Sequence, residues 1–384
     1  MIPPPLSLYI HTPWCLRKCP YCDFNSHALG GDLGEEAYVE ALLADLDVEA
    51  PLALGRPLQS IFIGGGTPSL FSAAAIGRLL RGVRERLEWV GDTEITLEAN
   101  PGAAEAAYFA GYREAGINRL SLGVQSFHPE SLRALQRIHG PEEAYAAVER
   151  ARRAGFHRIN LDLMFGLPGQ SPAMAEEDLR IAIGLETEHL SYYQLTLEPN
   201  TPFHHRPPPL PGEDDLWEMQ EAGQSRLAGA GFRRYEVSAY ARAGGRCRHN
   251  LNYWRFGDYL GIGAGAHGKV TGVDGAIQRR WKRRHPVEYM NALGRGDRLQ
   301  GIREVGPQER PVEFMMNVLR LMEGVEANLF EEATGIPLGR IEPTLRLLRQ
   351  KGLLVEDRRR LCATPLGIRF LDDLLTYFEV NGDI

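Results

Sequence analysis

Apolar and polar positions along the chain follow two alternating patterns. Short apolar runs rich in β-branched and aromatic residues are separated by longer segments with helical spacing of apolar residues, such as residues 38–48, 76–87 and 142–154. The candidate strands are residues 6–10, 60–63, 94–98, 119–124, 158–164 and 191–197. This alternation predicts successive parallel βα units, and therefore an α/β fold.

A weak internal repeat supports this prediction. The sequences AGINR, AGFHR and AGFRR begin at residues 115, 154 and 230, each between a helical segment and an apolar run. Glycine there can adopt the left-handed conformation that ends a helix and turns the chain into a strand. The six predicted βα units indicate an incomplete (β/α)6 TIM-like barrel, with functional residues after the strands.

The later part of the chain changes character. Residues 198–215 are rich in proline, and beyond about residue 300 the pattern becomes three helices and a hairpin. We therefore expect a core domain over residues 1–240, a connecting segment over 241–300, and a small, mostly helical, winged-helix-like domain over 301–384. Winged-helix modules often bind DNA, but the chain carries a formal charge of −7, so we expect no nucleic-acid partner.

Composition is that of a globular protein, with 43% hydrophobic and 24% charged residues among 384. Five cysteines, three of them clustered, favour a reducing, cytoplasmic setting over a disulfide framework. We expect neither a secretory signal nor a membrane span, because the apolar runs are short and broken by glycine or charge.

The cysteine cluster follows the first predicted strand. Cys15, Cys19 and Cys22 have the spacing Cys-x3-Cys-x2-Cys, which supplies three thiolates to a four-iron cubane and leaves one iron without a protein ligand. A zinc site with His11 or His27 as fourth ligand is an alternative. A redox-active Cys19–Cys22 pair is another.

The surroundings of these cysteines resemble the radical S-adenosylmethionine (SAM) family, with Tyr21 as the aromatic residue before the last cysteine. The similarity extends over essentially the full length to the branch that contains oxygen-independent coproporphyrinogen III dehydrogenases and HemW-type haem chaperones. It rests on the sequences YIHTPWC, FIGGGTPS, LEANP, GVQSF, LQRIHG and NLDLMFGLPGQ.

The resemblance implies a [4Fe-4S] cluster on the three cysteines and SAM bound at the open iron, where electron transfer can cleave its sulfonium. The residues that it implies around SAM are Tyr9, Phe24, Gly65, Gly66, Thr67, Glu98, Gln125, Arg137 and Asp162, with His267 as a further candidate. Other interpretations exist for single motifs. GGGTP can be an ordinary turn, Glu98 or Asp162 a helix cap, and Arg137 part of a solvated helix face.

This chain differs from the dehydrogenases of this branch in two features. The dehydrogenases usually carry a fourth cysteine where this chain has Phe24, and a longer segment than the fourteen residues that precede Cys15 here. The sequence HNLNYW at residues 249–254 resembles the HNxxYW signature of HemW-type chaperones. His249 is then the candidate axial ligand of haem iron. Cys247 is a weaker candidate, and is more simply an inert thiol.

We therefore expect a haem chaperone that binds haem and passes it to an acceptor protein, a membrane protein being among the candidate acceptors. The alternative is an enzyme, an oxygen-independent coproporphyrinogen III dehydrogenase that decarboxylates porphyrinogen propionates. The chaperone interpretation requires no catalytic residue. A zinc-binding structural or DNA-contacting protein is a third interpretation.

Overall fold

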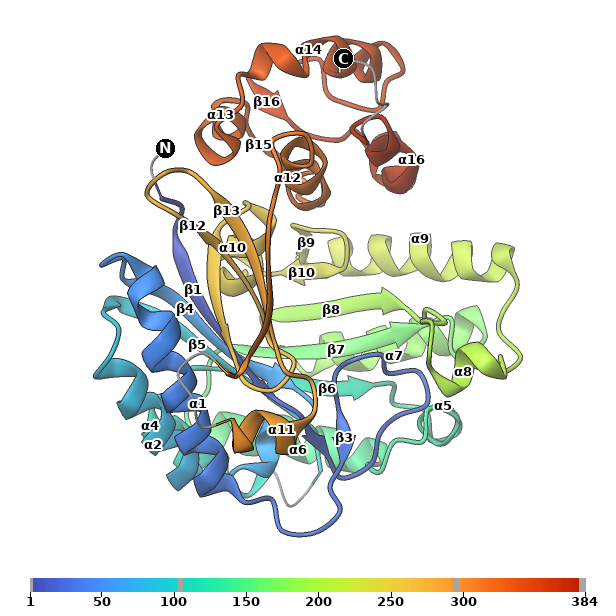
Figure 1. Ribbon diagram of the computed structural model, residues 1–384. Coiled ribbons are helices and arrows are strands. Elements are labelled where there is room, and N and C mark those ends of the chain that lie inside the picture. Colours follow the sequence, from blue (N-terminus) through green and yellow to red (C-terminus); the bar gives the residue numbers. More distant parts are fainter. Residues whose placement is uncertain (1–2, 103–105, 293–296, 380–384) are drawn as a thin grey trace.

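The computed structural model describes residues 3–102, 106–292 and 297–379. Six parallel strands form the centre of a large sheet, each pairing with the next (Figure 1). They are β1 (Leu6–Thr12), β4 (Leu58–Gly65), β5 (Trp89–Ala99), β6 (Arg119–Gln125), β7 (Ile159–Phe165) and β8 (His189–Gln194). Each overlaps one of the six predicted strands.

The sheet continues beyond both edges of this parallel centre. On one side β11 (Asp258–Ile262) pairs parallel to β1, followed by the antiparallel strands β12 (His267–Thr271), β13 (Ile277–Lys282) and β14 (Leu299–Glu304). On the other, β10 (Ala239–Ala241) and β9 (Arg233–Arg234) extend from β8. No pairing within the described residues joins the two edges, so the barrel is open.

Helices that follow the parallel strands lie along the outside of the sheet, and several of them pack against one another (Figure 1). They are α1 (Glu35–Glu49), α2 (Ala73–Arg84), α4 (Phe109–Ala115), α6 (Pro141–Arg153), α7 (Pro172–Gly184) and α9 (Glu213–Gly229). Gly116, Gly155 and Gly231 have φ values of 111°, 83° and 82° at the ends of α4, α6 and α9. The predicted left-handed glycine turns are confirmed.

Shorter elements complete the barrel and its loops. The two-residue strands β2 (Trp14–Cys15) and β3 (His27–Ala28) pair with each other. The short helices are α5 (Pro129–Ala134), α8 (Pro202–His205), α10 (Arg248–Trp254) and α11 (Pro286–Asn291), with 3-10 turns η1 (Ala50–Ala53) and η2 (Pro68–Leu70). No helix of the described ranges is long and apolar enough to cross a membrane.

The C-terminal part is mostly helical and lies above the barrel in Figure 1. Its elements are α12 (Arg310–Val318), β15 (Val325–Glu326), α13 (Asn328–Thr334), η3 (Leu338–Arg340), α14 (Glu342–Gln350), β16 (Arg360–Leu361), α15 (Pro365–Arg369) and α16 (Leu371–Thr376). Its core is separate from the barrel core but includes Phe256 and Ile277. Phe256 and Ile277 therefore join the connecting segment to the C-terminal core. The domain divisions at residues 240 and 300 stay a prediction.

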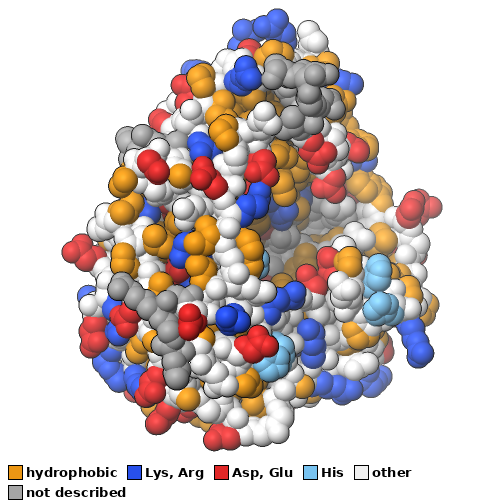
Figure 2. Space-filling model, in the orientation of Figure 1, with side chains coloured by type: hydrophobic (Ala, Val, Ile, Leu, Met, Phe, Trp, Pro, Cys, Tyr) orange, Lys and Arg blue, Asp and Glu red, His pale blue; other side chains and the backbone are white. Residues whose placement is uncertain are grey.

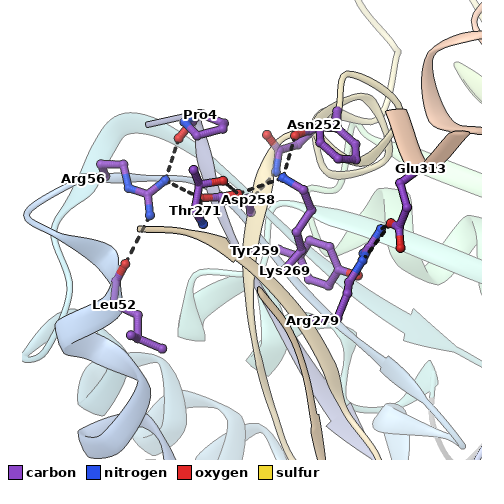
Figure 3. A network of polar contacts seen from close by, with 11 residues as sticks. Pro4, Leu52, Arg56, Asn252, Asp258, Tyr259, Lys269, Thr271, Arg279 and Glu313 are labelled. Atoms are coloured by element: carbon purple, nitrogen blue, oxygen red, sulfur yellow. Dashed lines mark hydrogen bonds and ion pairs between the residues drawn. The ribbon is translucent and has the colours of Figure 1, made fainter. Parts of the chain in front are cut away.

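A buried ionic network holds the added strands to the barrel (Figure 3). The Asp258 carboxylate accepts from Arg56 at 2.7 Å, from Lys269 at 2.9 Å and from the Thr271 hydroxyl at 2.9 Å. Asn252 of α10 donates to the Asp258 carbonyl at 2.8 Å. Because buried charges are costly unless paired, this network favours one arrangement of α10, β11 and β12.

Candidate functional site

Two adjoining cavities lie where the parallel strands end, and the surface is hollowed below the C-terminal domain (Figure 2). We call them the cysteine cavity, of about 340 Å³, and the aromatic cavity, of about 670 Å³. Phe24, 59% exposed, borders both. The predicted residues in the cysteine cavity are Cys15, Cys19, Cys22, Phe24, Gly65, Gly66, Thr67, Glu98, Gln125, Arg137 and Asp162. Tyr9 and His267, predicted in the same set, line the aromatic cavity.

The three cysteines lie on one loop closed by short backbone contacts. The β2–β3 pair closes its base, and the Cys22 amide donates to the Cys19 carbonyl at 3.2 Å. All three thiols are free and half-buried. Burial raises the pKa of Cys15 and Cys22. Arg137 Nη1 donates to Cys19 Sγ at 3.6 Å, which ties the loop to the cavity wall.

The glycines after β4 allow the chain to pack closely against this loop. Gly66 donates its amide to the Thr12 carbonyl at 2.7 Å. A Cβ atom at Gly66 would lie 2.5 Å from the Trp14 carbonyl oxygen, which is backbone and cannot rotate away. The close approach seen here is therefore to the cysteine loop itself.

Two carboxyl groups face the cysteine cavity from β5 and β7, the strands on either side of β6. Glu98 accepts from the Gly65 amide at 3.1 Å, and burial together with Asp162 raises the pKa of Glu98 to about 8. Asp162 accepts from Asn160 at 2.8 Å and Ser121 at 3.0 Å, and burial raises its pKa. Neither acts as a helix cap, since Ser171 caps the helix after β7 and no side chain caps the helix after β5.

Arg137 is fixed inside the site and is not part of a solvated helix face. Its Nη2 donates to Asn100 Oδ1 at 2.5 Å and to the Gly123 carbonyl at 2.7 Å. Its Nε is buried without a hydrogen-bond partner. Nearby, Gln125 has a left-handed φ of 70° and accepts from the Tyr193 hydroxyl at 2.9 Å. Backbone strain of this kind is concentrated at functional sites.

The histidine of the HNLNYW sequence is enclosed. His249 is 0% exposed, its Nδ1 is 2.9 Å from Ser60 Oγ, and its Nε2 is 2.8 Å from the Tyr253 hydroxyl. Burial lowers the pKa of His249 to about 3, so the ring is neutral. Both nitrogens have protein partners, so iron ligation by His249 stays a prediction and would require breaking one of these contacts.

Cys247 is also away from both cavities. It is 2% exposed, and burial raises the pKa of its thiol to about 12. A buried thiol with a raised pKa is unreactive, so the structure favours the interpretation of Cys247 as an inert thiol.

Of the two histidines proposed for a zinc site, His11 and His27, the first has partners at both ring nitrogens. His11 Nδ1 lies 2.9 Å from the Tyr9 hydroxyl and its Nε2 lies 2.9 Å from the Asn25 carbonyl. Within the described ranges, no three His, Cys, Asp or Glu side chains are grouped to hold a single metal ion.

Two family models match the chain, that of the radical SAM superfamily over residues 9–182 and that of the HemN C-terminal domain over residues 305–370. The chain is 52% identical over 375 residues to a protein of Escherichia coli (strain K12) named heme chaperone HemW, covering 98% of each. A protein of the same name from Bacillus subtilis (strain 168) is 37% identical over 370 residues, covering 94% of this chain and 96% of that one. This chain belongs to the HemW family.

The fold of this HemW-family chain is similar to a solved structure of coproporphyrinogen III oxidase (HemN) from Escherichia coli. The TM-score is 0.83 at 24% identity, covering 98% of this chain and 91% of that one. At this identity the likeness concerns the fold alone. The expected fold class is confirmed, namely an open α/β barrel with a mostly helical C-terminal domain.

The radical SAM superfamily implies a [4Fe-4S] cluster and SAM, and the cysteine cavity of this HemW-family chain fits them. Three thiols from one loop match three irons of a cubane. The buried, unpartnered Nε of Arg137 and the carboxyl groups of Glu98 and Asp162 supply polar partners for a charged, nucleoside-containing molecule. Sequence patterns missed Asn100 and Tyr193, which orient Arg137 and Gln125. Asn100 lies within the sequence LEANP, and Tyr193 lies in β8.

Proposed function

We propose that this chain is a haem chaperone, which binds haem and passes it to an acceptor protein. One observation carries the proposal: a cavity of about 670 Å³ with aromatic walls shares Phe24 with the cysteine cavity. Its volume suits a small-molecule site, and aromatic side chains suit a flat apolar macrocycle. The name that the HemW relatives carry, heme chaperone, agrees with this. Membrane proteins are among the acceptors to be tested.

In this proposal Cys15, Cys19 and Cys22 hold the cluster and leave one iron open for SAM. When bound, the cluster supplies an electron that can cleave the sulfonium. The remaining lining residues bind and orient SAM, and they are Gly65, Gly66, Thr67, Glu98, Gln125, Arg137 and Asp162. Tyr9 and Phe24 would flank the cofactor beside the cluster, Tyr9 from the aromatic cavity and Phe24 from the border of both cavities.

The chain's own residues set the charge of the cysteine cavity. Glu98, with its raised pKa of about 8, is mostly protonated at pH 7 and can donate a hydrogen bond. Arg137, oriented by Asn100 and the Gly123 carbonyl, offers a fixed positive charge to a carboxylate. We infer that this pair orients an amino-acid group.

The rival function is oxidation of a porphyrinogen, and its residue pattern is incomplete here. Phe24 stands where the dehydrogenases usually carry a further cysteine. The likeness to HemN concerns the fold and does not favour that activity for this chain.

The test is anaerobic reconstitution of the full chain followed by haem titration and transfer. We expect about four irons and four sulfides per chain, consistent with a single cubane, a saturable Soret band, and movement of haem to an apo-haemoprotein. A variant with all three cysteines of the loop changed to serine is the control, and should lose iron and sulfide. Absence of saturable haem binding, or catalytic conversion of coproporphyrinogen III to protoporphyrinogen IX, would overturn the proposal.

A further inference from the structure

The aromatic cavity contains one imidazole that is free to bind a metal. Two histidines line it, His11 and His267. Both nitrogens of His11 have partners, Tyr9 and the Asn25 carbonyl, each at 2.9 Å. His267 is exposed, and its ring has no hydrogen-bond partner among the described residues. His249 does not line this cavity.

The position of His267 suits a ligand that approaches a flat molecule from one side. It begins β12 and lies directly opposite Trp281 of β13 in the antiparallel ladder, so both side chains extend from the same face of the sheet. Tyr253 and Tyr259 form another part of the lining, with ring centroids 4.5 Å apart. The cavity therefore places an imidazole among large aromatic surfaces.

The charged side chains that line the aromatic cavity are the ones that the two propionates of a porphyrin would meet. Lys282 lines the cavity, but its ammonium is committed to Asp45 at 2.6 Å and Glu49 at 2.8 Å. Arg284 is exposed at the rim, and a guanidinium can bind a carboxylate with two parallel hydrogen bonds. Asp23 on the cysteine loop opposes this charge. We therefore expect the affinity for haem to come mainly from the aromatic walls of the cavity and from a protein ligand of the iron.

We propose that the aromatic cavity binds haem with His267 as the axial ligand of the iron. This inference rests on the proposed haem-chaperone function and identifies its binding site. A neutral imidazole is a common ligand of haem iron, and the partial burial of the His267 ring together with Arg284 and Arg279 lowers its pKa, which favours the neutral ring.

In this arrangement the HNLNYW sequence positions the cavity wall. Ser60 on β4 fixes His249, and His249 fixes the hydroxyl of Tyr253, a residue that lines the cavity. His249 is then a positioning residue whose replacement lowers stability and weakens binding while leaving the type of iron ligand unchanged.

The test is a ferric-haem titration of the full chain with four variants. In His267→Ala we expect at least a tenfold rise in Kd and a Soret shift that added imidazole reverses. His267→Cys should bind haem with a thiolate-type spectrum, because the ligand changes type in place. His157→Ala, an exposed histidine outside both cavities, is the matched control and should match the wild type. His249→Gln should keep the wild-type Soret position.

The outcomes separate this inference from the function on which it rests. If the wild type binds no haem at saturation, both proposals are overturned. If the wild type binds haem and His267→Ala keeps its Kd and Soret position, only the ligand assignment is overturned. The ligand assignment is also overturned if His249→Gln loses the imidazole-type spectrum while His267→Ala keeps it. Circular dichroism must show that His249→Gln is folded.

Discussion

Glu98 shows how a single buried side chain can set the pH response of this chain. Burial and the neighbouring Asp162 raise the pKa of Glu98 from its usual 4.5 to about 8. The folded chain therefore holds a proton at Glu98 that the unfolded chain releases. By linkage, the free energy of unfolding falls as pH rises from about 4.5 through about 8, by about 1.4 kcal/mol per pH unit at most.

Replacing Glu98 with glutamine should remove this dependence, because glutamine keeps an oxygen to accept from the Gly65 amide and does not titrate. We expect Glu98→Gln without cofactors to resemble the wild type near pH 4 and to be more stable at pH 8, by on the order of 4 kcal/mol. Urea unfolding at the two pH values measures this. Glu114→Gln, at an exposed carboxylate, is the control. Equal pH dependence in wild type and Glu98→Gln would refute the assignment.

Glu98 and Asp162 belong to β5 and β7, whose strand character the local apolar runs predicted, and both side chains line the cysteine cavity. Parallel strands bring their carboxyl ends together, so position in the chain is enough to place them. The sequence could not predict the environment of His249, because Ser60 is 189 residues away and reaches it only in the folded chain. Nor could it distinguish the two cavities, which separate Tyr9 and His267 from the cysteines.

At the scale of elements, the end of β4 and the cysteine loop form one packed unit. Gly66 lies at their contact, where a Cβ atom would lie 2.5 Å from the Trp14 carbonyl oxygen. Trp14 pairs with His27 across the base of the loop and immediately precedes Cys15. A shift of this backbone would therefore displace the first thiol.

We expect Gly66→Ala to lower iron and sulfide incorporation severalfold after anaerobic reconstitution, because the three thiols would no longer surround one cluster. Gly184→Ala is a matched control, since no atom lies within 4 Å of a Cβ there and φ is not positive. Iron and sulfide assays with circular dichroism distinguish a local effect from unfolding. Wild-type cluster content in Gly66→Ala would contradict this account.

The six central strands were predictable from local apolar runs, whereas the extension by β11 to β14 was not. Residues 241–300 read as a connecting segment, because β11 is only five residues long and contains a glycine. What makes it a strand is parallel pairing with β1 and the buried contacts of Asp258 with Arg56 and Lys269 (Figure 3). Such distant partners leave no periodic pattern in the sequence.

At the scale of the whole molecule, the C-terminal domain and the segment carrying HNLNYW share a core. Phe314 of α12 is fully buried, with its ring 5.5 Å from that of Phe256 and 5.4 Å from that of Phe330, centroid to centroid. Phe256 follows α10 by two residues. Arg320 stacks over Trp254 of α10, 4.4 Å from the ring centroid. The domain therefore supports the helix that presents Tyr253 to the aromatic cavity.

Phe314→Ala should lower the free energy of unfolding by about 3–5 kcal/mol, the cost of removing a fully buried aromatic ring. It should also weaken haem binding, because α10 would lose support through Phe256. Met316→Ala, on the same helix but 53% exposed, should change neither quantity appreciably. Urea unfolding and haem titration of the two variants measure both effects. If Phe314→Ala is destabilised as expected but binds haem as tightly as the wild type, the C-terminal core does not support the cavity wall.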